Sequence, residues 1–406
     1  MEKKTEKYDV VIIGGGAAGL TAGIYCGRAR LNTLLIEKSL VGGLATYTNE
    51  IENYPGFPDG STGLGLMELF QKQAKKFGVK FKGTDVQGVK LKGHTKIVET
   101  FRTNYEAKVV LVTSGGKPRL TKAKGEELFL YDKGISFCAT CDAAANTDKT
   151  VMVIGSGDAA IEEGMFLTKF ASKVIVSVMH DEGIMDCNEI AKQQALANPK
   201  MEFIWNTLPE EFVGNERLET VVLKNSKSNS LMRFDVDSCF LFIGYVPNTE
   251  IFKDEVILNK QGYVITNELM ETNVPGVFAA GDVRDKAFKQ VATAVGDGAI
   301  AGWAAEKYIA ETEIFEDQIM GGDLPSIVFV WNAVIPSCRD LLPTVEAFEE
   351  KYKGKVKVTK VDIYKSKGLA ERLGIIEIPA IVYIKDGKIE SSLMHDITVE
   401  RIESLL

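Results

Sequence analysis

The chain has 406 residues, of which 45% are apolar and 26% are charged, and its net charge is −8. This length allows two or three ordinary domains, and the composition is that of a soluble globular protein. With no long basic block, the sequence does not favour nucleic acid or an anionic membrane as a partner. The first apolar run, Val10–Ile13, is too short for a signal peptide or a membrane span, and six mostly scattered cysteines fit a reducing compartment. We therefore expect a cytoplasmic protein.

A dinucleotide-binding unit is predicted at the start of the chain. Its parts are a strand, a glycine-rich turn, a helix and a second strand, at Tyr8–Ile13, Gly14–Gly19, Leu20–Arg28 and Thr33–Glu37. Gly14 allows the tight turn, Gly16 lets the backbone approach a pyrophosphate, and Gly19 lets the helix pack against the strand. Glu37 ends the second strand, where an acid can accept from ribose hydroxyls.

The same unit is predicted a second time. Its parts are Thr150–Ile154, Gly155–Ala160, Ile161–Phe170 and Lys173–Val178. Gly155, Gly157 and Asp158 belong to the turn, and Ala160 replaces the third glycine with a residue still small enough for close packing. The sequence therefore offers a second possible nucleotide site.

Two cysteines spaced as CxxC, Cys138 and Cys141, lie just before the second unit and are followed by Asp142. Such a pair can close an easily opened disulfide, and one thiol usually has a lowered pKa. Half of a zinc site is the alternative, but it needs a second pair of ligands at suitable spacing. The remaining cysteines stand singly, at Cys26, Cys187, Cys239 and Cys338. We interpret the pair as redox-active, and the first three single cysteines as small core residues.

A further motif follows at Pro275–Asp282, an apolar strand that ends in Gly281-Asp282. Apolar residues at helical spacing follow and predict a helix over Gln290–Tyr308. These segments are either an ordinary strand and buried helix or part of a flavin site, with Asp282 on a ribityl hydroxyl.

The end of the chain forms a separate predicted unit after a polar linker at Glu311–Leu324. A strand, a helix, a strand, a short helix and a hairpin are expected at Ser326–Trp331, Cys338–Tyr352, Val356–Asp362, Leu369–Leu373, and Ala380–Lys385 with Lys388–Leu393.

From about residue 8 to 312 the chain resembles the low-molecular-weight bacterial thioredoxin reductases. Six segments in the family's order carry the resemblance: GGGAAGLTAGIY, ENYPGFP, SFCATCD, GSGDAAIEE, FIGYVPNT and PGVFAAGDV. It implies an α/β fold of two doubly wound, Rossmann-like domains. The implied divisions are an FAD domain at 1–117 and 246–312, an inserted NAD(P)-type domain with the CxxC at 118–245, a linker at 313–321 and a further domain at 322–406.

The resemblance also implies an activity, the reduction of thioredoxin or another protein disulfide by a homodimeric FAD enzyme. By this analogy Cys138 attacks the partner's disulfide, Cys141 lies nearer the flavin, and Asp142 exchanges protons with the thiols. Asp142 is alternatively, or in addition, the N-cap of the helix after the CxxC. FAD contacts are expected from Gly14, Gly16, Ala17, Ala18, Gly19, Glu37, Gly43, Asn53, Gly115, Gly281, Asp282, Gln290, Val291 and Ala292.

The electron donor is where the sequence departs from this family. Arginines that clamp the 2′-phosphate of NADPH are replaced by Met179, His180 and Ile184. Each such contact is worth about 1.5–3 kcal/mol, so NADPH is disfavoured. NADH or a protein donor such as ferredoxin is expected instead, although Asp181 stands far along the loop for a ribose-binding acid. A flavoprotein that senses or scaffolds is a further alternative, which the intact CATCD argues against.

Residues 322–406 resemble a thioredoxin domain, with Pro379 where that fold has a cis-proline beside its active site. The expected CxxC reads Ile335-Pro336-Ser337-Cys338, so the first cysteine is missing. A lone thiol forms no internal disulfide, and a redox-inactive docking domain is favoured over a monothiol site at Cys338.

Overall fold

The computed structural model describes residues 3–48, 51–364 and 367–406. The chain divides into two compact units, Met1–Trp303 and Ala304–Leu406, and each is described by itself. No helix in these described parts is long and apolar enough to cross a membrane.

The first unit contains a seven-stranded sheet in the order β3-β2-β1-β6-β5-β4, with β17 paired to β6. Its strands are β1 (Lys4–Ile13), β2 (Thr33–Glu37), β3 (Lys80–Gly83), β4 (Val86–Lys90), β5 (Lys96–Thr100), β6 (Thr103–Val112) and β17 (Val277–Ala279). β1 runs parallel to both β2 and β6, so the ends of β1, β2 and β6 lie along one edge of the sheet. Strand β17 joins this sheet from a distant part of the sequence.

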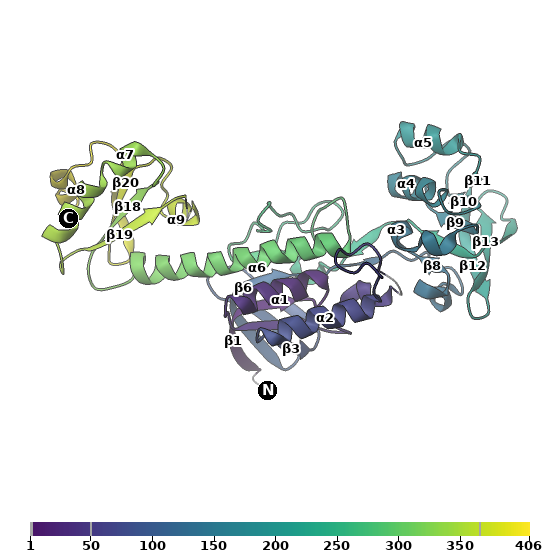
Figure 1. Cartoon of the computed structure of the whole chain (residues 1–406), viewed down its shortest axis with the longest axis horizontal. Coiled ribbons are helices and arrows are strands. Elements are labelled where there is room, and N and C mark those ends of the chain that lie inside the picture. The colour runs from purple at the N-terminus through teal and green to yellow at the C-terminus, as the bar shows by residue number, and fades with distance from the viewer. Residues whose placement is uncertain (1–2, 49–50, 365–366) are drawn as a thin grey trace. The chain divides into compact units, whose positions relative to one another are not determined.

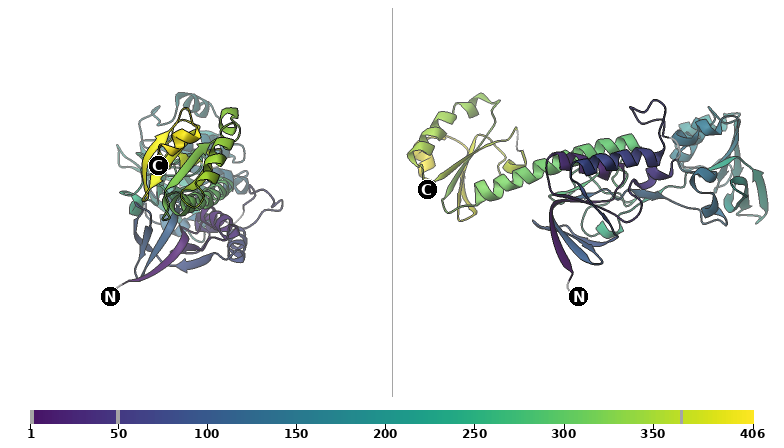
Figure 2. Two further views of the ribbon diagram at one scale, coloured as in Figure 1. Left: turned by 90° about the vertical axis from the view of Figure 1, so that its left-hand side faces the viewer. Right: turned by 60° about the horizontal axis from the view of Figure 1, so that its bottom comes forward.

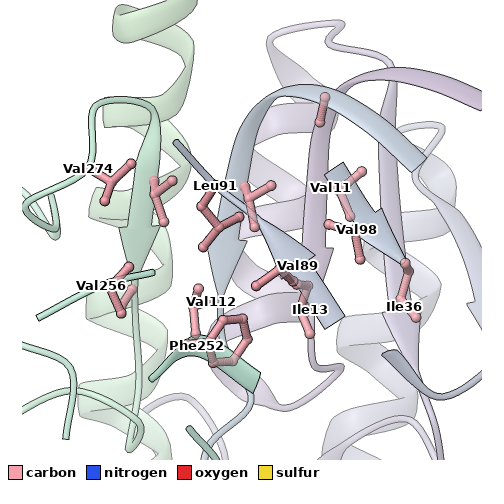
Figure 3. Packing of buried hydrophobic residues seen from close by; sticks show 14 of the residues in the cluster. Val11, Ile13, Ile36, Val89, Leu91, Val98, Val112, Phe252, Val256 and Val274 are labelled. Atoms are coloured by element: carbon pink, nitrogen blue, oxygen red, sulfur yellow. The ribbon is translucent and has the colours of Figure 1, made fainter. Parts of the chain in front are cut away.

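Apolar side chains of the central strand β1 face two layers. Ile12 points toward helix α1 (Ala17–Arg28), against Gly23. Helix α2 (Gly63–Lys76) lies beside α1 over the same sheet (Figure 1). Val11 and Ile13 point the other way, into a buried cluster completed by Phe252 and neighbouring residues (Figure 3). This period of two explains why the strand reads as a continuous apolar run.

A second, parallel sheet has the order β11-β10-β9-β15-β8. Its strands are β8 (Ile135–Ser136), β9 (Thr150–Ile154), β10 (Lys173–Val178), β11 (Met201–Trp205) and β15 (Ser238–Leu241). The associated helices are α3 (Ala139–Asp142), α4 (Asp158–Leu167) and α5 (Glu189–Leu196). An antiparallel sheet of β12 (Thr207–Gly214), β13 (Leu218–Asn225) and β14 (Leu231–Asp235) accompanies it.

Two short strands, β7 (Gly116–Pro118) and β16 (Tyr245–Pro247), pair antiparallel and lie where the chain passes between the two large sheets. The remaining turns of helix in this unit are η1 (Gly43–Tyr47), η2 (Glu126–Phe129), η3 (Tyr131–Lys133), η4 (Ala144–Asn146) and η5 (Glu250–Phe252). Helix α6 (Val291–Glu313), green in Figure 2, has its first half in this unit, where it packs on α1, and its remainder in the second unit.

The second unit is built on a four-stranded sheet in the order β19-β18-β20-β21. Its elements are η6 (Ile314–Met320), β18 (Ser326–Trp331), α7 (Pro336–Arg339), α8 (Leu342–Lys351), β19 (Lys357–Asp362), α9 (Lys367–Arg372), β20 (Ala380–Lys385), β21 (Lys388–Leu393) and α10 (Val399–Glu403). Alternate residues of β18 serve opposite faces: Val328 and Val330 join one apolar cluster, and Ile327 and Phe329 join the other.

The expected linker is not an irregular segment. Helix α6 runs to Glu313 and continues as a π-helix to Met320. Ile319 is fully buried in the cluster beside β18, and Arg372 donates a hydrogen bond to Thr312 at 2.9 Å. The prediction weighed the polar residues of this stretch and missed its few apolar residues at helical spacing.

A helix expected at Cys338–Tyr352 is divided into α7 and α8. Pro343 stands in the first turn of α8 and has no N–H to bond back to the preceding turn, so one continuous helix cannot form. Smaller differences concern helix and strand ends. The first strand begins at Lys4, α1 begins at Ala17, and α4 ends at Leu167.

Candidate active site

The two cysteines of the CxxC form a disulfide, Cys138–Cys141, with 5.3 Å between their Cα atoms. Cys138 precedes the first turn of α3, and both residues are partly exposed. The Nε2 atom of Gln290, the residue before α6, lies 3.9 Å from Cys138 Sγ and 3.5 Å from Thr140 Oγ1. The redox pair is therefore in contact with the loop that leads into α6.

A partly buried carboxyl group, that of Asp142, stands one residue beyond the disulfide. Ser136 Oγ donates a hydrogen bond to it at 2.5 Å, which favours the ionised form. Burial outweighs this bond and raises the pKa of Asp142, with a smaller contribution from the negative charge of Asp132. A carboxyl of raised pKa can hold and release a proton beside the thiols.

The N-cap interpretation of Asp142 is wrong. Asp142 is the last residue of α3, whose N-cap is Cys138, and the next turn, η4, has Ala143 as its N-cap. Its backbone carbonyl is also bound, by Asn146 Nδ2 at 2.8 Å. The side chain turns back to Ser136 and is free of any capping role.

Aromatic side chains surround the segment before the disulfide. Tyr131 stacks on Tyr47 with 4.6 Å between ring centroids and meets the edge of Phe137. The hydroxyl of Tyr245 donates to the carbonyl of Phe137 at 3.2 Å, and burial raises the pKa of this phenol, so it stays neutral. These contacts fix the backbone immediately before Cys138.

The glycine turn after β1 has the backbone that its sequence predicts. Gly14 has a φ of +109°, and a Cβ on it would lie 2.3 Å from the carbonyl oxygen of Thr113. A Cβ on Gly19 would lie 2.0 Å from the carbonyl oxygen of Gly14. At Gly16, by contrast, the nearest atom would be 3.9 Å away, which leaves open space in front of the N-terminus of α1. An anion fits there because the first N–H groups of α1 have no side-chain cap.

Several of the other predicted flavin residues lie at this turn. Glu37 accepts the N–H of Gly15 at 2.8 Å, and Gly281 packs against Ala18 at the start of α1. Asn53 Nδ2 donates to Gln290 at 3.2 Å. The remaining residues begin helical segments or follow strands: Ala17 in α1, Gly43 in η1, Val291 and Ala292 in α6, and Gly115 after β6.

One buried atom marks this region as a ligand site. Asp282 Oδ1 is buried and accepts no hydrogen bond from the residues that the structure describes; it forms an ion pair with Lys286 Nζ, which at 3.7 Å lies beyond hydrogen-bond distance. Burial raises the pKa of Asp282 despite the nearby lysines. A sugar-alcohol hydroxyl would supply the missing hydrogen bond, so the residues present fit FAD.

The glycine turn after β9 has the same backbone but a different environment. Gly155 has a φ of +131°, and Ala160 is fully buried at the helix–strand contact. Two carboxylates lie at this turn. Asp158 Oδ1 accepts two hydrogen bonds from Asn188, at 2.7 and 2.9 Å, and Asp186 Oδ2 accepts one from Ser156 at 3.2 Å.

The positions expected to clamp NADPH carry no suitable cation. Met179 and Ile184 are both more than half exposed, and His180 Nε2 is bound to Asp186 at 2.8 Å. Asp181 forms an ion pair with Lys227.

Residues 8–298 match the family described as Pyridine nucleotide-disulphide oxidoreductase. The chain belongs to this family. A thioredoxin reductase of Peptoclostridium acidaminophilum is 42% identical over 308 residues, which are 74% of this chain and 97% of the relative. A thioredoxin reductase of Listeria innocua is 39% identical over 312 residues, which are 77% of this chain and 97% of the relative. The crystal structure of thioredoxin reductase from Streptococcus pyogenes is 38% identical, with a TM-score of 0.70 over 75% of this chain and 98% of that one.

As a member of the pyridine nucleotide-disulphide oxidoreductases, the chain is a thioredoxin reductase-like flavoenzyme and a disulfide oxidoreductase. Residues 306–406 match a second family, Thioredoxin.

Within this thioredoxin domain Cys338 is fully buried in α7, and the Ile378–Pro379 bond is cis, as the resemblance predicts. Ile335, which replaces the first cysteine, is 36% exposed. The three other single cysteines are Cys26 and Cys239, both buried as predicted, and Cys187, which is only partly buried.

Sequence reasoning missed several residues of the site. Ser136 binds Asp142, and Asp297 accepts the N–H of Gly281 at 3.0 Å while pairing with Lys286. Asp186 was missed as well. No spacing rule could have found it, because it reaches the second turn from a loop about thirty residues further along the chain.

Proposed function

We propose that this chain is an FAD-dependent reductase of protein disulfides that works through Cys138 and Cys141, with thioredoxin or a thioredoxin-like protein as substrate. The observation that carries the proposal is the partly exposed Cys138–Cys141 disulfide with the partly buried carboxyl of Asp142, whose pKa is raised, beside it. A purely scaffolding flavoprotein would have no use for an exchangeable disulfide with a proton carrier at its side.

The exchange follows from these three side chains. In the dithiol form, the Cys138 thiolate attacks a sulfur of the partner's disulfide, and the partner's other sulfur leaves as a thiolate that takes up a proton. Cys141 then attacks Cys138, the mixed disulfide breaks, and the partner departs with two thiols while the Cys138–Cys141 bond re-forms. Asp142 supplies and recovers the proton that each leaving thiolate needs.

We infer that FAD is held by the first turn and the residues around it, with the pyrophosphate before α1, Glu37 on a ribose and Asp282 on a ribityl hydroxyl. The open space at Gly16 and the unsatisfied Asp282 Oδ1 support this placement. When bound, FAD supplies the two electrons that reduce the disulfide. The FAD domain would comprise 1–117 and 246–312, and the inserted domain 118–245.

The donor that reduces the flavin is proposed to be NADH or a protein such as ferredoxin rather than NADPH. Exposed Met179 and Ile184 offer a 2′-phosphate no charge, and His180 is occupied by Asp186. Rates of thioredoxin reduction with NADH, NADPH and reduced ferredoxin, each in a separate assay, decide among them. Fast turnover with NADPH would contradict this part of the proposal.

Further parts of the proposal concern assembly and partners. We propose a cytoplasmic homodimer formed through the FAD domain, in which the thioredoxin domain selects or docks partners and does not carry electrons. Full burial of Cys338 supports a redox-inactive role. Sedimentation of the full chain would test the dimer.

The disulfide reductase itself is tested with dithionite as an artificial donor and oxidised thioredoxin as acceptor. We expect turnover in the natural chain and none in Cys138→Ser or Cys141→Ser, with flavin content unchanged. Turnover that persists in both variants would refute the proposal.

A further inference from the structure

The two glycine turns are held to their sheets in the same way. The N–H of Gly14 donates to the last but one residue of β2 at 2.9 Å, and the N–H of Gly155 donates to the last but one residue of β10 at 3.2 Å. The final residues of these strands, Glu37 and Val178, therefore occupy equivalent positions. Glu37 can accept from a ribose, whereas Val178 is fully buried and has no polar side-chain atom.

A loop from later in the sequence closes on each turn, again in the same way. Gly42 forms a parallel bridge with Gly16 and donates its N–H to the residue before Gly16 at 2.7 Å. Asp186 forms a parallel bridge with Gly157 and donates its N–H to the residue before Gly157 at 3.0 Å. Asp186 thus stands in the second turn where the first turn has a glycine.

The Asp186 carboxylate is fixed at the turn. Its Oδ2 atom accepts a hydrogen bond from Ser156 at 3.2 Å and contacts His180 Nε2 at 2.8 Å. A second carboxylate, that of Asp158, lies in the first turn of α4, and two hydrogen bonds from Asn188 lower its pKa. The N-terminus of α4 therefore faces negative charge supplied by the chain itself, where a bound pyrophosphate would bring more.

Space is not what differs between the turns. A Cβ on Gly157 would meet no atom of the described residues within 4 Å, so the backbone of the second turn is as accessible as that of the first. The difference is charge: a pyrophosphate at the second turn would lie beside carboxylates, and like charges at this range repel. The residues present therefore do not fit a dinucleotide.

We propose that Asp186 determines donor specificity by excluding the pyrophosphate of both NADH and NADPH from the second turn. The inserted fold then serves to carry the dithiol, and the two electrons per turnover enter at the flavin from a redox protein, one at a time if its centre is a one-electron carrier. This inference rests on the proposed function. It narrows the choice of electron donor to a protein, because it excludes both NADH and NADPH.

Binding of the unreactive nucleotides NAD⁺ and NADP⁺ to the purified holoprotein, measured by titration calorimetry, tests the proposal. We expect no binding by the natural chain at millimolar nucleotide. In Asp186→Gly, which copies Gly42, and in Asp186→Asn, which keeps a side chain that can accept from Ser156, affinity for NAD⁺ should rise at least about tenfold. Asp181→Asn is the matched control, because it also removes a loop carboxylate, one that pairs with Lys227.

Micromolar binding by the natural chain would overturn the proposal, as would both Asp186 variants remaining without binding while flavin absorbance and unfolding temperature show that they are folded. Dithionite-driven reduction of thioredoxin is measured on the same samples. If the natural chain did not reduce thioredoxin, the proposed disulfide reductase activity would be refuted. The nucleotide titration tests the role of Asp186 alone.

Discussion

The glycine turn after β1 and the glycine turn after β9 share a backbone and differ in the side chains that reach them. Both begin with a glycine of positive φ, Gly14 at +109° and Gly155 at +131°, and both are bridged by a later loop. Around the first turn stand Glu37 and a glycine; around the second stand Val178 and Asp186. One turn is open to an anionic dinucleotide, and the other already faces carboxylates.

This difference shows what a glycine fingerprint reports. It predicts the strand, the turn and the close helix, all of which depend on residues inside the motif. Whether a nucleotide binds depends on residues outside it that reach the turn through the fold. A duplicated fold can therefore keep its backbone while its second copy positions a disulfide at its edge.

An alanine substitution should be costly in the first turn and without effect in the second, and this is the largest difference we expect. In Gly16→Ala the new methyl group meets only Gly42 and so permits folding, but it projects into the space assigned to the pyrophosphate. FAD affinity should fall by about 10–100-fold, and activity with it. In Gly157→Ala neither flavin content nor dithionite-driven turnover should change. Flavin absorbance after gel filtration measures the flavin content of both variants. Equal flavin loss in the two would contradict the difference proposed between the turns.

Asp142→Asn should lower the turnover of oxidised thioredoxin by about 10²-fold, since no side chain then carries the proton between thiols. Its flavin content should stay unchanged. Single-turnover rates from the reduced enzyme check this expectation, and an unchanged rate would remove Asp142 from the mechanism.

The same variant should be more stable than the natural chain at high pH. Burial raises the folded-state pKa of Asp142 above its ordinary value of 3.8, so the folded state loses stability as the pH rises through that raised pKa. Asparagine carries no charge, so the variant's advantage in unfolding temperature should be present at pH 8 and vanish near pH 4. An advantage independent of pH would point to another cause.

Removal of Glu37 should have a smaller effect. Glu37→Ala leaves the N–H groups of Gly15 and Ser39 without their acceptor and removes a ribose contact. FAD affinity should fall by about tenfold. Glu68→Ala, an exposed acid on α2, is the control and should bind FAD normally. Equal FAD affinity in both variants, measured by fluorescence of the released flavin, would argue against a role for Glu37.

Cys338→Ala should change almost nothing. Cys338 is fully buried, and Ile335 stands where a CxxC motif would have the other cysteine, so Cys338 cannot form a disulfide within this motif. We expect turnover within about twofold of the natural chain, in contrast to the loss in Cys138→Ser. Thiol labelling of the reduced, folded protein should mark Cys138 and Cys141 and leave Cys338 unmodified. Labelling of Cys338, with loss of turnover in its variant, would revive a monothiol site.

Much of the fold could be predicted from the sequence because its signals are local. Strands β2, β9 and β10 have the predicted bounds, and the CxxC forms the expected disulfide. The linker prediction failed where a few apolar residues, Ile319 among them, outweigh many polar ones. Asp186 and Ser136 were unpredictable for another reason, since their roles depend on where loops close in space.

An anaerobic titration of the oxidised flavin tests the account most directly. We predict that millimolar NADH and NADPH leave the flavin absorbance unchanged, and that dithionite bleaches it after delivering four electrons per chain, two to the flavin and two to the Cys138–Cys141 disulfide. The Cys138→Ser, Cys141→Ser double variant should need only two. Bleaching by stoichiometric NADH or NADPH would show that the second turn does bind a nucleotide and would contradict the account.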